Sequence, residues 1–354
     1  MVTTRSSAPS ARRTPDGAPF DRLARTVATT GWIAVAAAVA VAVVAPDAAA
    51  AAMFVPLLIG IVLFGLPHGA LDHVVPARVG FAWGRTPVGV TVFLGAYLAL
   101  AVATLAAWTV APAATFAAFL VATVAHWGQG DLRFLQLHLG RRALGLADAL
   151  ATGGLRGALP VALPVLAYPD VVASLMGHAA TAVGAGGALP DPAAAPVQLA
   201  TAAFLAVAGA GWVATLRRAW ATRAGVTLDV AEVALLVATF LLVPPYLAIG
   251  VYFLFWHALR HLVRLLVLRP RERRDVAQGR TVRGWGRLAR DLVPMTVLAI
   301  LVLVGLWAWA APRLDGVEGY VATYLVWISA LTMPHMAVVA AMDVAPDAAR
   351  PVRA

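Results

Sequence analysis

The chain of 354 residues contains no cysteine, and all 27 of its basic residues are arginine. The lack of cysteine excludes disulfides, thiolate metal sites and cysteine nucleophiles, so any metal must be held by nitrogen or oxygen atoms. Charge is also scarce, because 12% of the residues are charged whereas 61% are hydrophobic. Soluble domains of this length do not have such a composition, and the sequence therefore predicts a protein embedded in a membrane.

Apolar runs of near-spanning length follow one another at 28–45, 50–69, 88–110, 113–130, 144–167, 196–216, 229–245, 246–268, 291–311 and 319–342. Since a spanning helix needs about 20 residues, the weaker runs can fail this criterion, and we predict an all-α, polytopic bundle of about eight to ten membrane helices. The run at 144–167 is the least regular, because it contains Arg156, Pro160 and Pro164. We expect it to be broken, tilted or re-entrant.

The predicted domain organisation is simple. A single transmembrane domain, 28–342, lies between an arginine-rich N-terminal tail, 1–27, and a short C-terminal tail, 343–354. The basic leader is long for a signal peptide, so we expect it to be retained.

The distribution of arginine predicts the topology. With the N-terminus in the cytoplasm, ten helices place almost every loop arginine on the cytoplasmic side and leave Arg313 on the other. We therefore predict a multi-pass protein of the cell membrane. The net charge is +10, and part of it lies in the arginine-rich loop 269–290. We expect this charge to fix the topology and to contact anionic lipid headgroups, and we do not expect it to bind nucleic acid.

Most of the eight histidines lie in apolar segments. The segments are GLPHGALDH with His68 and His73, AHWGQGD with His126, FWHALRH with His257 and His261, and MPHM with His335. Imidazoles are costly in a bilayer, so they indicate a site, and we predict an all-histidine metal centre. The helix order places the histidines at similar depth, but their lateral proximity is a hypothesis. His138 and His178 fall in predicted loops and receive no role.

The spacing of the polar residues refines this centre. His257 and His261 are four residues apart, which on a helix brings both rings to one face where they can share a cation. Asp72 is expected to share a face with His68, and Asp131 to lie near His126, so each is a candidate acceptor for an imidazole N–H. Capping of interfacial helix ends explains both aspartates equally well.

Two further histidines have a less defined place. His73, five residues after His68, points away from it and is treated as accessory. For His335 the sequence leaves three alternatives open: a ligand, a residue that supports a ligand, or a packed helix residue.

Neutral imidazoles suit iron, zinc, copper or nickel. Zinc usually accompanies hydrolysis, and a di-iron site needs more ligands than these histidines provide, so a single ferrous ion that binds O2 fits best. Two alternatives belong to other classes: a histidine-lined proton or metal-ion transporter and a bis-histidine haem protein. The inverted repeat expected of a transporter is not visible.

The motifs GLPHGALDH, AHWGQGD, YFLFWHALRH and TMPHM resemble the bacteriorhodopsin-related-protein-like (Brp/Blh) family of β-carotene 15,15′-dioxygenases. The resemblance covers roughly residues 60 to 340. It implies a multi-pass membrane enzyme that uses Fe(2+) and O2 to cleave β-carotene at its central double bond into two molecules of retinal. It also implies that His68, His126, His257 and His261 bind the iron, and that a rhodopsin apoprotein receives the retinal.

A substrate without polar groups requires a long apolar groove. The candidate walls are Trp127, Phe253, Phe255, Trp256, Tyr324 and Trp327, although each of these aromatic residues is equally expected to face lipid. Such a reaction needs no general acid or base, which agrees with the scarcity of carboxylates expected within the membrane.

Overall fold

The computed structural model describes residues 18–187 and 189–344, and within these ranges the chain forms helices and no strand. Nine helical segments of this described part are long and apolar enough to cross a membrane. The predicted all-α bundle of about eight to ten membrane helices is thus confirmed.

The α-helices are α1 (Ala18–Val44), α2 (Pro46–Ala51), α3 (Val55–Gly60), α4 (Val75–Arg78), α5 (Pro87–Val110), α6 (Pro112–Phe134), α7 (Leu146–Asp148), α8 (Gly154–Ala167), α9 (Pro169–Ala182), α10 (Ala195–Ala219), α11 (Arg223–Leu242), α12 (Pro245–Tyr252), α13 (Leu259–Leu268), α14 (Pro270–Ala277), α15 (Thr281–Ala310) and α16 (Gly316–Val344). The π-helices are η2 (Ile61–Gly65), η6 (Leu135–Leu139), η7 (Ala149–Gly153) and η8 (Phe253–Ala258), and the 3-10 helices are η3 (Pro67–Gly69), η4 (Asp72–Val74), η5 (Ala82–Arg85) and η9 (Ala311–Arg313). Proline is the first residue of α5, α6, α9 and α12, a position where its missing N–H costs no hydrogen bond.

Three predicted runs differ from simple spanning helices. The run at 50–69 is divided into α2, α3, η2 and η3, since its prolines interrupt regular hydrogen bonding. The irregularity expected at 144–167 takes the form of the π-helix η7, after which α8 continues through Pro160 and Pro164. The run at 113–130 forms the long helix α6, which is not among the nine apolar segments because its last turns carry polar side chains.

The N-terminal helix begins earlier than hydropathy alone indicates. α1 starts at Ala18 and not near 28, and its first turns bury Phe20, Leu23 and Val27 while Arg22 and Arg25 stay exposed. An amphipathic stretch of this kind has low mean hydropathy but still packs one face. The remaining residues of the predicted N-terminal tail, 1–17, lie outside the described residues, as do residues 345–354 of the C-terminal tail.

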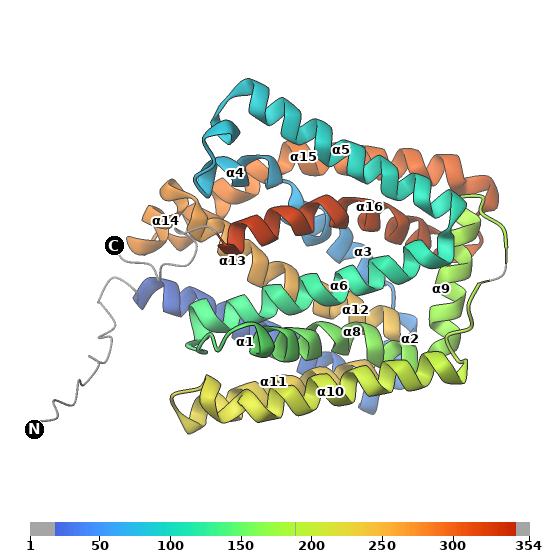
Figure 1. The fold of residues 1–354 in the computed structure, drawn as a ribbon, viewed down its shortest axis with the longest axis horizontal. Helices are drawn as coiled ribbons and strands as arrows, with labels where there is room; N and C mark the ends of the chain where they lie inside the picture. The colour runs from blue at the N-terminus through green and yellow to red at the C-terminus, as the bar shows by residue number, and fades with distance from the viewer. Residues whose placement is uncertain (1–17, 188, 345–354) are drawn as a thin grey trace, which may run out of the picture.

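Most long helices run side by side along the longest axis of the molecule, and α9 crosses them at one end (Figure 1). At the opposite end lie α4, α14 and the turn between α10 and α11 (Figure 1). These elements carry many of the arginines, so the basic segments gather at one end of the bundle as the predicted topology requires.

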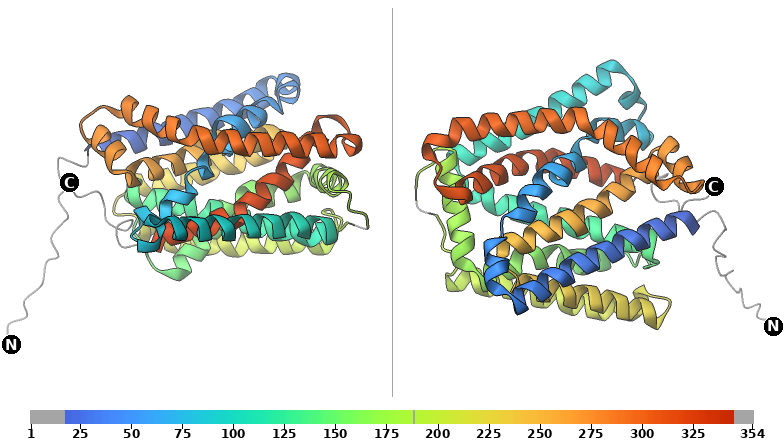
Figure 2. Two further views of the ribbon diagram at one scale, coloured as in Figure 1. Left: turned by 90° about the horizontal axis from the view of Figure 1, so that it is seen from above. Right: turned by 180° about the vertical axis from the view of Figure 1, so that it is seen from behind.

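The burial of the helices divides the bundle into a centre and a rim. In an 18-residue apolar window of the segment Pro245–Leu268, 78% of the residues are buried, whereas the corresponding shares are 11% for α5 and 17% for Thr281–Arg313. Seen from behind, α15 and α5 both lie at the upper margin of the molecule, and seen from above they lie apart from each other (Figure 2). The helix pair α12–α13 therefore forms the centre, and α5 and α15 form part of the lipid-facing rim.

Contact between α6 and α8 depends on glycine. A Cβ atom added to Gly128 would lie 1.8 Å from the carbonyl oxygen of Gly153, and one added to Gly157 would lie 1.9 Å from that of Val124. Small residues allow backbones of membrane helices to approach closely. This close packing fixes the position of the part of α6 that carries His126.

Candidate metal centre and adjoining cavities

The histidines of the apolar segments come from irregular pieces of helix. His68 lies in η3 directly after the π-helix η2, and His257 lies in the π-helix η8, which continues into α13 with His261. His126 and His335 come from the long helices α6 and α16. Single π turns change the direction in which following side chains point and are frequent at functional sites.

Five of these imidazoles form one buried cluster. The ring centroid of His68 lies 4.9 Å from that of His335, 5.7 Å from that of His261 and 5.9 Å from that of His257. The ring of His126 lies 4.9 Å from those of His257 and His335. All five side chains are buried. The structure thus brings the four expected iron ligands together, and it adds His335.

The unpaired nitrogen atoms of the cluster fit a metal ion. Within the described residues, the Nε2 atoms of His257, His261 and His335 and both ring nitrogens of His126 are buried without a hydrogen-bond partner. Unpaired buried nitrogens are costly, and coordination of a cation would satisfy them. Ligand atoms of His68, His126 and His335 lie within 4.8 Å of one another. This separation is close to the roughly 4 Å that two nitrogens bound to one ion reach.

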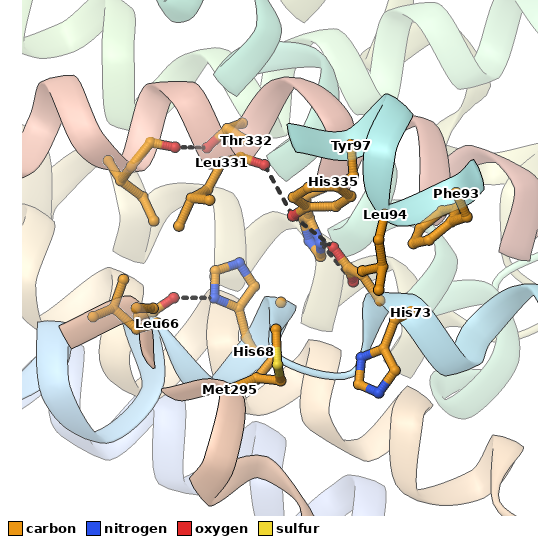
Figure 3. A pocket seen from close by; sticks show the side chains of 16 residues that line it. Leu66, His68, His73, Phe93, Leu94, Tyr97, Met295, Leu331, Thr332 and His335 are labelled. Carbon is orange, nitrogen blue, oxygen red and sulfur yellow. Dashed lines mark hydrogen bonds and ion pairs between the residues drawn. The ribbon is translucent and has the colours of Figure 1, made fainter. Parts of the chain in front are cut away.

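Two hydrogen bonds orient members of the cluster. Nδ1 of His68 lies 2.5 Å from the carbonyl oxygen of Gly65, which selects the tautomer in which Nε2 carries the lone pair. Nδ1 of His335 lies 2.8 Å from Asp72 Oδ2, and the hydroxyl of Tyr97 donates to the same oxygen over 3.0 Å. Figure 3 shows Tyr97 and His335 close together, with dashed lines at these contacts.

Asp72 contacts an imidazole nitrogen as expected, but the expected shared face with His68 is not present. Asp72 accepts from His335 and not from His68, because the chain between His68 and Asp72 is 3-10 helix and turn, so residues four apart do not share a face. His73 is half-buried and points away from His68 (Figure 3).

Asp131 also has other partners than expected. It is five residues beyond His126 on α6, about 140° around the helix, and so it points away from the cluster. It accepts hydrogen bonds from Arg156, Arg260 and, over 3.1 Å, the indole of Trp256.

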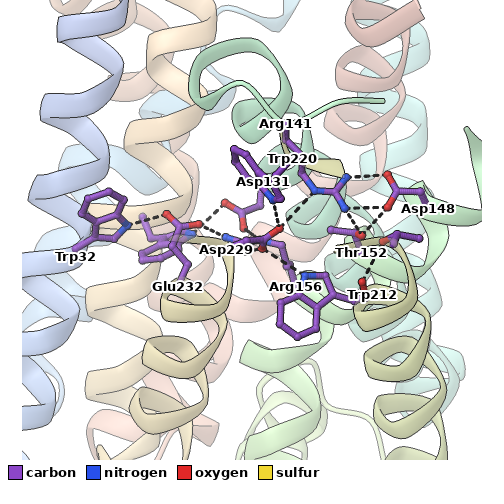
Figure 4. A network of polar contacts seen from close by, with 12 residues as sticks. Trp32, Asp131, Arg141, Asp148, Thr152, Arg156, Trp212, Trp220, Asp229 and Glu232 are labelled. Carbon is purple, nitrogen blue, oxygen red and sulfur yellow. Dashed lines mark hydrogen bonds and ion pairs between the residues drawn. The ribbon is translucent and has the colours of Figure 1, made fainter. Parts of the chain in front are cut away.

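Asp131 belongs to a buried network of charges that the sequence reasoning missed (Figure 4). Arg156 contacts Asp131, Asp229 and Glu232, and Arg260 contacts Asp131 and Glu232. The expected scarcity of carboxylates within the membrane is therefore wrong, because the bundle holds several, each paired with arginine. Charges of opposite sign in separate apolar runs, such as Arg156 against Asp229 and Glu232, are the signal that could have revealed the network.

The charge network borders the histidine cluster through Arg260. Arg260 stands between His257 and His261 in the sequence, and its guanidinium lies 4.0 Å from the ring centroid of Trp256. A second set of contacts joins Asp343 of α16 to Arg264 of α13 and, over 2.7 Å, to Gln129 of α6. Helices that supply four of the five imidazoles are thus tied together by polar contacts.

Two apolar cavities adjoin the cluster. The inner cavity, about 180 Å³, lies among α6, α8, α9, α12 and α16, and Trp127, Phe253 and Tyr324 line it as expected of a groove. The outer cavity, about 110 Å³, lies among η3, α5, α15 and α16. Its lining includes Tyr97 and His335.

The other predicted groove residues lie elsewhere. Trp256 is fully buried against the charge network, Trp327 packs among Tyr246 and Leu303, and Phe255 packs against the core around α1 and α11. The extra residue in each turn of the π-helix η8 turns Phe253 toward the cavity and Trp256 away from it.

Comparison with known proteins agrees with the motifs. A family model described as beta-carotene 15,15′-dioxygenase matches residues 59–343. The chain belongs to this family. A relative from Halobacterium salinarum named probable beta-carotene 15,15′-dioxygenase Blh is 34% identical over 330 residues, which are 91% of this chain and 93% of the relative. A second protein of that organism, named probable beta-carotene 15,15′-dioxygenase Brp, is 27% identical over 79% of this chain and 81% of its own. No solved structure is significantly similar.

The range that matches the beta-carotene 15,15′-dioxygenase family contains the whole histidine cluster, the lining of the outer cavity and that of the inner cavity apart from Leu57. It also contains His138 and His178, which lie in helices and not in the loops we predicted. His138 lies in η6 beside Phe134, and His178 lies in α9 with Nε2 3.5 Å from Glu318. Neither ring belongs to the cluster.

Proposed function

We propose that this protein is an iron-dependent membrane dioxygenase that cleaves β-carotene at the 15,15′ double bond to give two molecules of retinal. The observation that carries the proposal is the cluster of buried imidazoles, in which His126, His257, His261 and His335 have unpaired nitrogens, placed against an apolar cavity in a chain of this family. Such a site joins a donor set for a reactive metal to a binding space for a hydrocarbon.

The ion proposed is Fe(2+), held by His68, His126, His257 and His261. Bound there, it would supply the binding of O2 and its reaction with a carbon–carbon double bond. The reaction balances without other reactants, since the double bond breaks and each of its carbons takes one atom of O2 as an aldehyde oxygen. A bis-histidine haem is disfavoured because the five imidazoles are crowded. The centroids of neighbouring rings, such as His68 and His335 or His68 and His257, are 4.9 to 5.9 Å apart.

The protein's own side chains position the substrate and exclude water. Trp127, Phe253 and Tyr324 offer aromatic walls to a polyene that has no polar group. No proton transfer is needed, and the nearby carboxylates are already engaged: Asp131 with arginines, Asp72 with His335 and Tyr97.

The same proposal covers location and partners. We infer a multi-pass protein of the cell membrane with a cytoplasmic N-terminus, surrounded by the lipid in which β-carotene dissolves. Retinal would leave the site for a rhodopsin apoprotein.

The test is expression in a β-carotene-producing bacterial host, with extraction and chromatography of the pigments. We expect loss of colour, appearance of retinal and about one iron per purified protein. Variants His257→Ala and His261→Ala should lose both iron and retinal formation, whereas His138→Ala, outside the cluster, should keep both. A Soret band in the purified protein, or unchanged pigment with full-length protein in the membrane, would refute the proposal.

A further inference from the structure

The inner and outer cavities share a wall next to the cluster. Among the residues that the structure describes, His68, Ile328 and Thr332 alone line both. The hydroxyl of Thr332 donates to the carbonyl oxygen of Ile328 over 2.7 Å, so this wall presents no unpaired hydroxyl proton to either side. An imidazole of the proposed metal centre therefore stands where the two apolar spaces meet.

The outer cavity opens toward lipid. Two of its lining side chains belong to the rim helices and are exposed: Leu94 of α5 at 42% and Met295 of α15 at 36%. Figure 3 shows both around the space that His68 and His335 enter. Because these helices face the bilayer over most of their length, an opening between them gives access from the acyl chains and not from water.

The side chains that line the inner cavity are more deeply buried than those that line the outer one. None of its lining side chains is exposed. Tyr246, which lines it, precedes His257 by eleven residues of helix, a rise of about 16 Å. Val165, which also lines it, follows Gly157 by eight residues of α8, a rise of about 12 Å from the level at which α8 contacts α6 beside His126. The cavity is therefore deep and apolar, and Val171, Val172 and Leu175 of α9 line its far end.

We propose that the two cavities form one passage by which a long, rod-shaped hydrocarbon is taken up sideways from the lipid. The molecule enters between α5 and α15, passes His68 and places its leading half in the inner cavity, while its trailing half stays in the outer one. The depth of the inner cavity then sets which double bond lies at the histidine cluster. This inference rests on the proposed function for the identity of the hydrocarbon, β-carotene.

The opening is tested by the double substitution Leu94→Trp and Met295→Trp. The matched control is Leu98→Trp and Leu298→Trp, on the same two helices, exposed at 63% and 52% and lining neither cavity. We expect at least about tenfold slower retinal formation in vesicles for the first variant only, with unchanged bound iron in both. A second measurement uses metal-free protein and follows the rate at which it takes up β-carotene from vesicles.

The role of the far end of the inner cavity is tested by Val172→Trp, a substitution that fills part of this cavity. The leading half can then no longer reach full depth, so we expect cleavage at a bond nearer that end, giving one shorter and one longer aldehyde. The control is Val207→Trp on the exposed face of α10.

The outcomes separate the passage from the chemistry. Equal retinal formation and equal uptake in the Leu94/Met295 variant and its control would refute entry between α5 and α15. If Val172→Trp gives retinal as its only product at an unchanged rate, the depth of the inner cavity does not select the bond that is cleaved. If the wild type makes no retinal but metal-free protein still takes up β-carotene, and the Leu94/Met295 variant slows that uptake, the passage stands and the proposed reaction fails.

Discussion

Nδ1 of His335 lies 2.8 Å from the carboxylate of Asp72, although 263 residues separate them in the sequence. With its proton engaged there, the ring presents Nε2 to the cluster as the lone-pair nitrogen, and this atom has no other partner in the described chain. A carboxylate that holds an imidazole in this way fixes its tautomer and raises its basicity toward a metal. His335 is thus placed to act as a further ligand or to shield the ion.

Replacing Asp72 by Asn should weaken iron binding by about 10–100-fold, because the amide holds the His335 ring less firmly and lacks the negative charge. The measurement is competition for iron with a chelator of known affinity. His73→Ala is the matched control, since His73 adjoins Asp72 in the sequence but points away from His68 (Figure 3). Equal affinities in the two variants would show that the Asp72–His335 contact does not support the metal.

Replacing Gly128 by Ala should displace His126, although Gly128 is not itself a member of the histidine cluster. The added Cβ would lie 1.8 Å from the carbonyl oxygen of Gly153, so α6 and α8 must move apart, and α6 carries His126. Overpacking of this kind typically costs about 1–3 kcal/mol. We expect a lower melting temperature and less bound iron. Gly209→Ala, which has open space around it on α10, should change neither, and retention of full iron by the Gly128 variant would contradict the argument.

Replacing Arg156 by Met should destabilise the bundle strongly. The guanidinium is fully buried and contacts three carboxylates, which would be left partly unpaired. Removing one partner from a buried ionic network costs about 3–5 kcal/mol. Unfolding of detergent-solubilised protein measures the loss, and the exposed Arg218→Met on α10 provides the comparison. Similar stability of both variants would mean that the network is not needed for the fold.

The sequence predicts some of this architecture well and some of it not at all. Hydropathy identifies the spans, and the four-residue spacing of His257 and His261 predicts a common site, because both depend on local periodicity. Lateral packing does not follow from local patterns, so the convergence on His68 and the pairing of Asp72 with His335 emerge only in the structure.

The π-helices limit prediction for a related reason. The π-helix η8 breaks the 3.6-residue period, and this is why Phe253 lines the inner cavity while Trp256 reaches the charge network. The network itself combines charges from the four helices α6, α8, α11 and α13, and no one of their apolar runs, considered alone, shows how its charges are paired.

A reporter active only outside the cytoplasm should be active when it is inserted between α9 and α10, and inactive when it is inserted at Gly279 between α14 and α15. The physical reason is the gathering of arginine at one end of the bundle, where α14 lies, while α9 lies at the other (Figure 1). Positive residues near the ends of spanning helices stay on the cytoplasmic side during insertion. Activity at Gly279 alone would show that the topology is reversed and that the histidine cluster lies in the other half of the membrane. Activity at both positions would contradict the predicted topology.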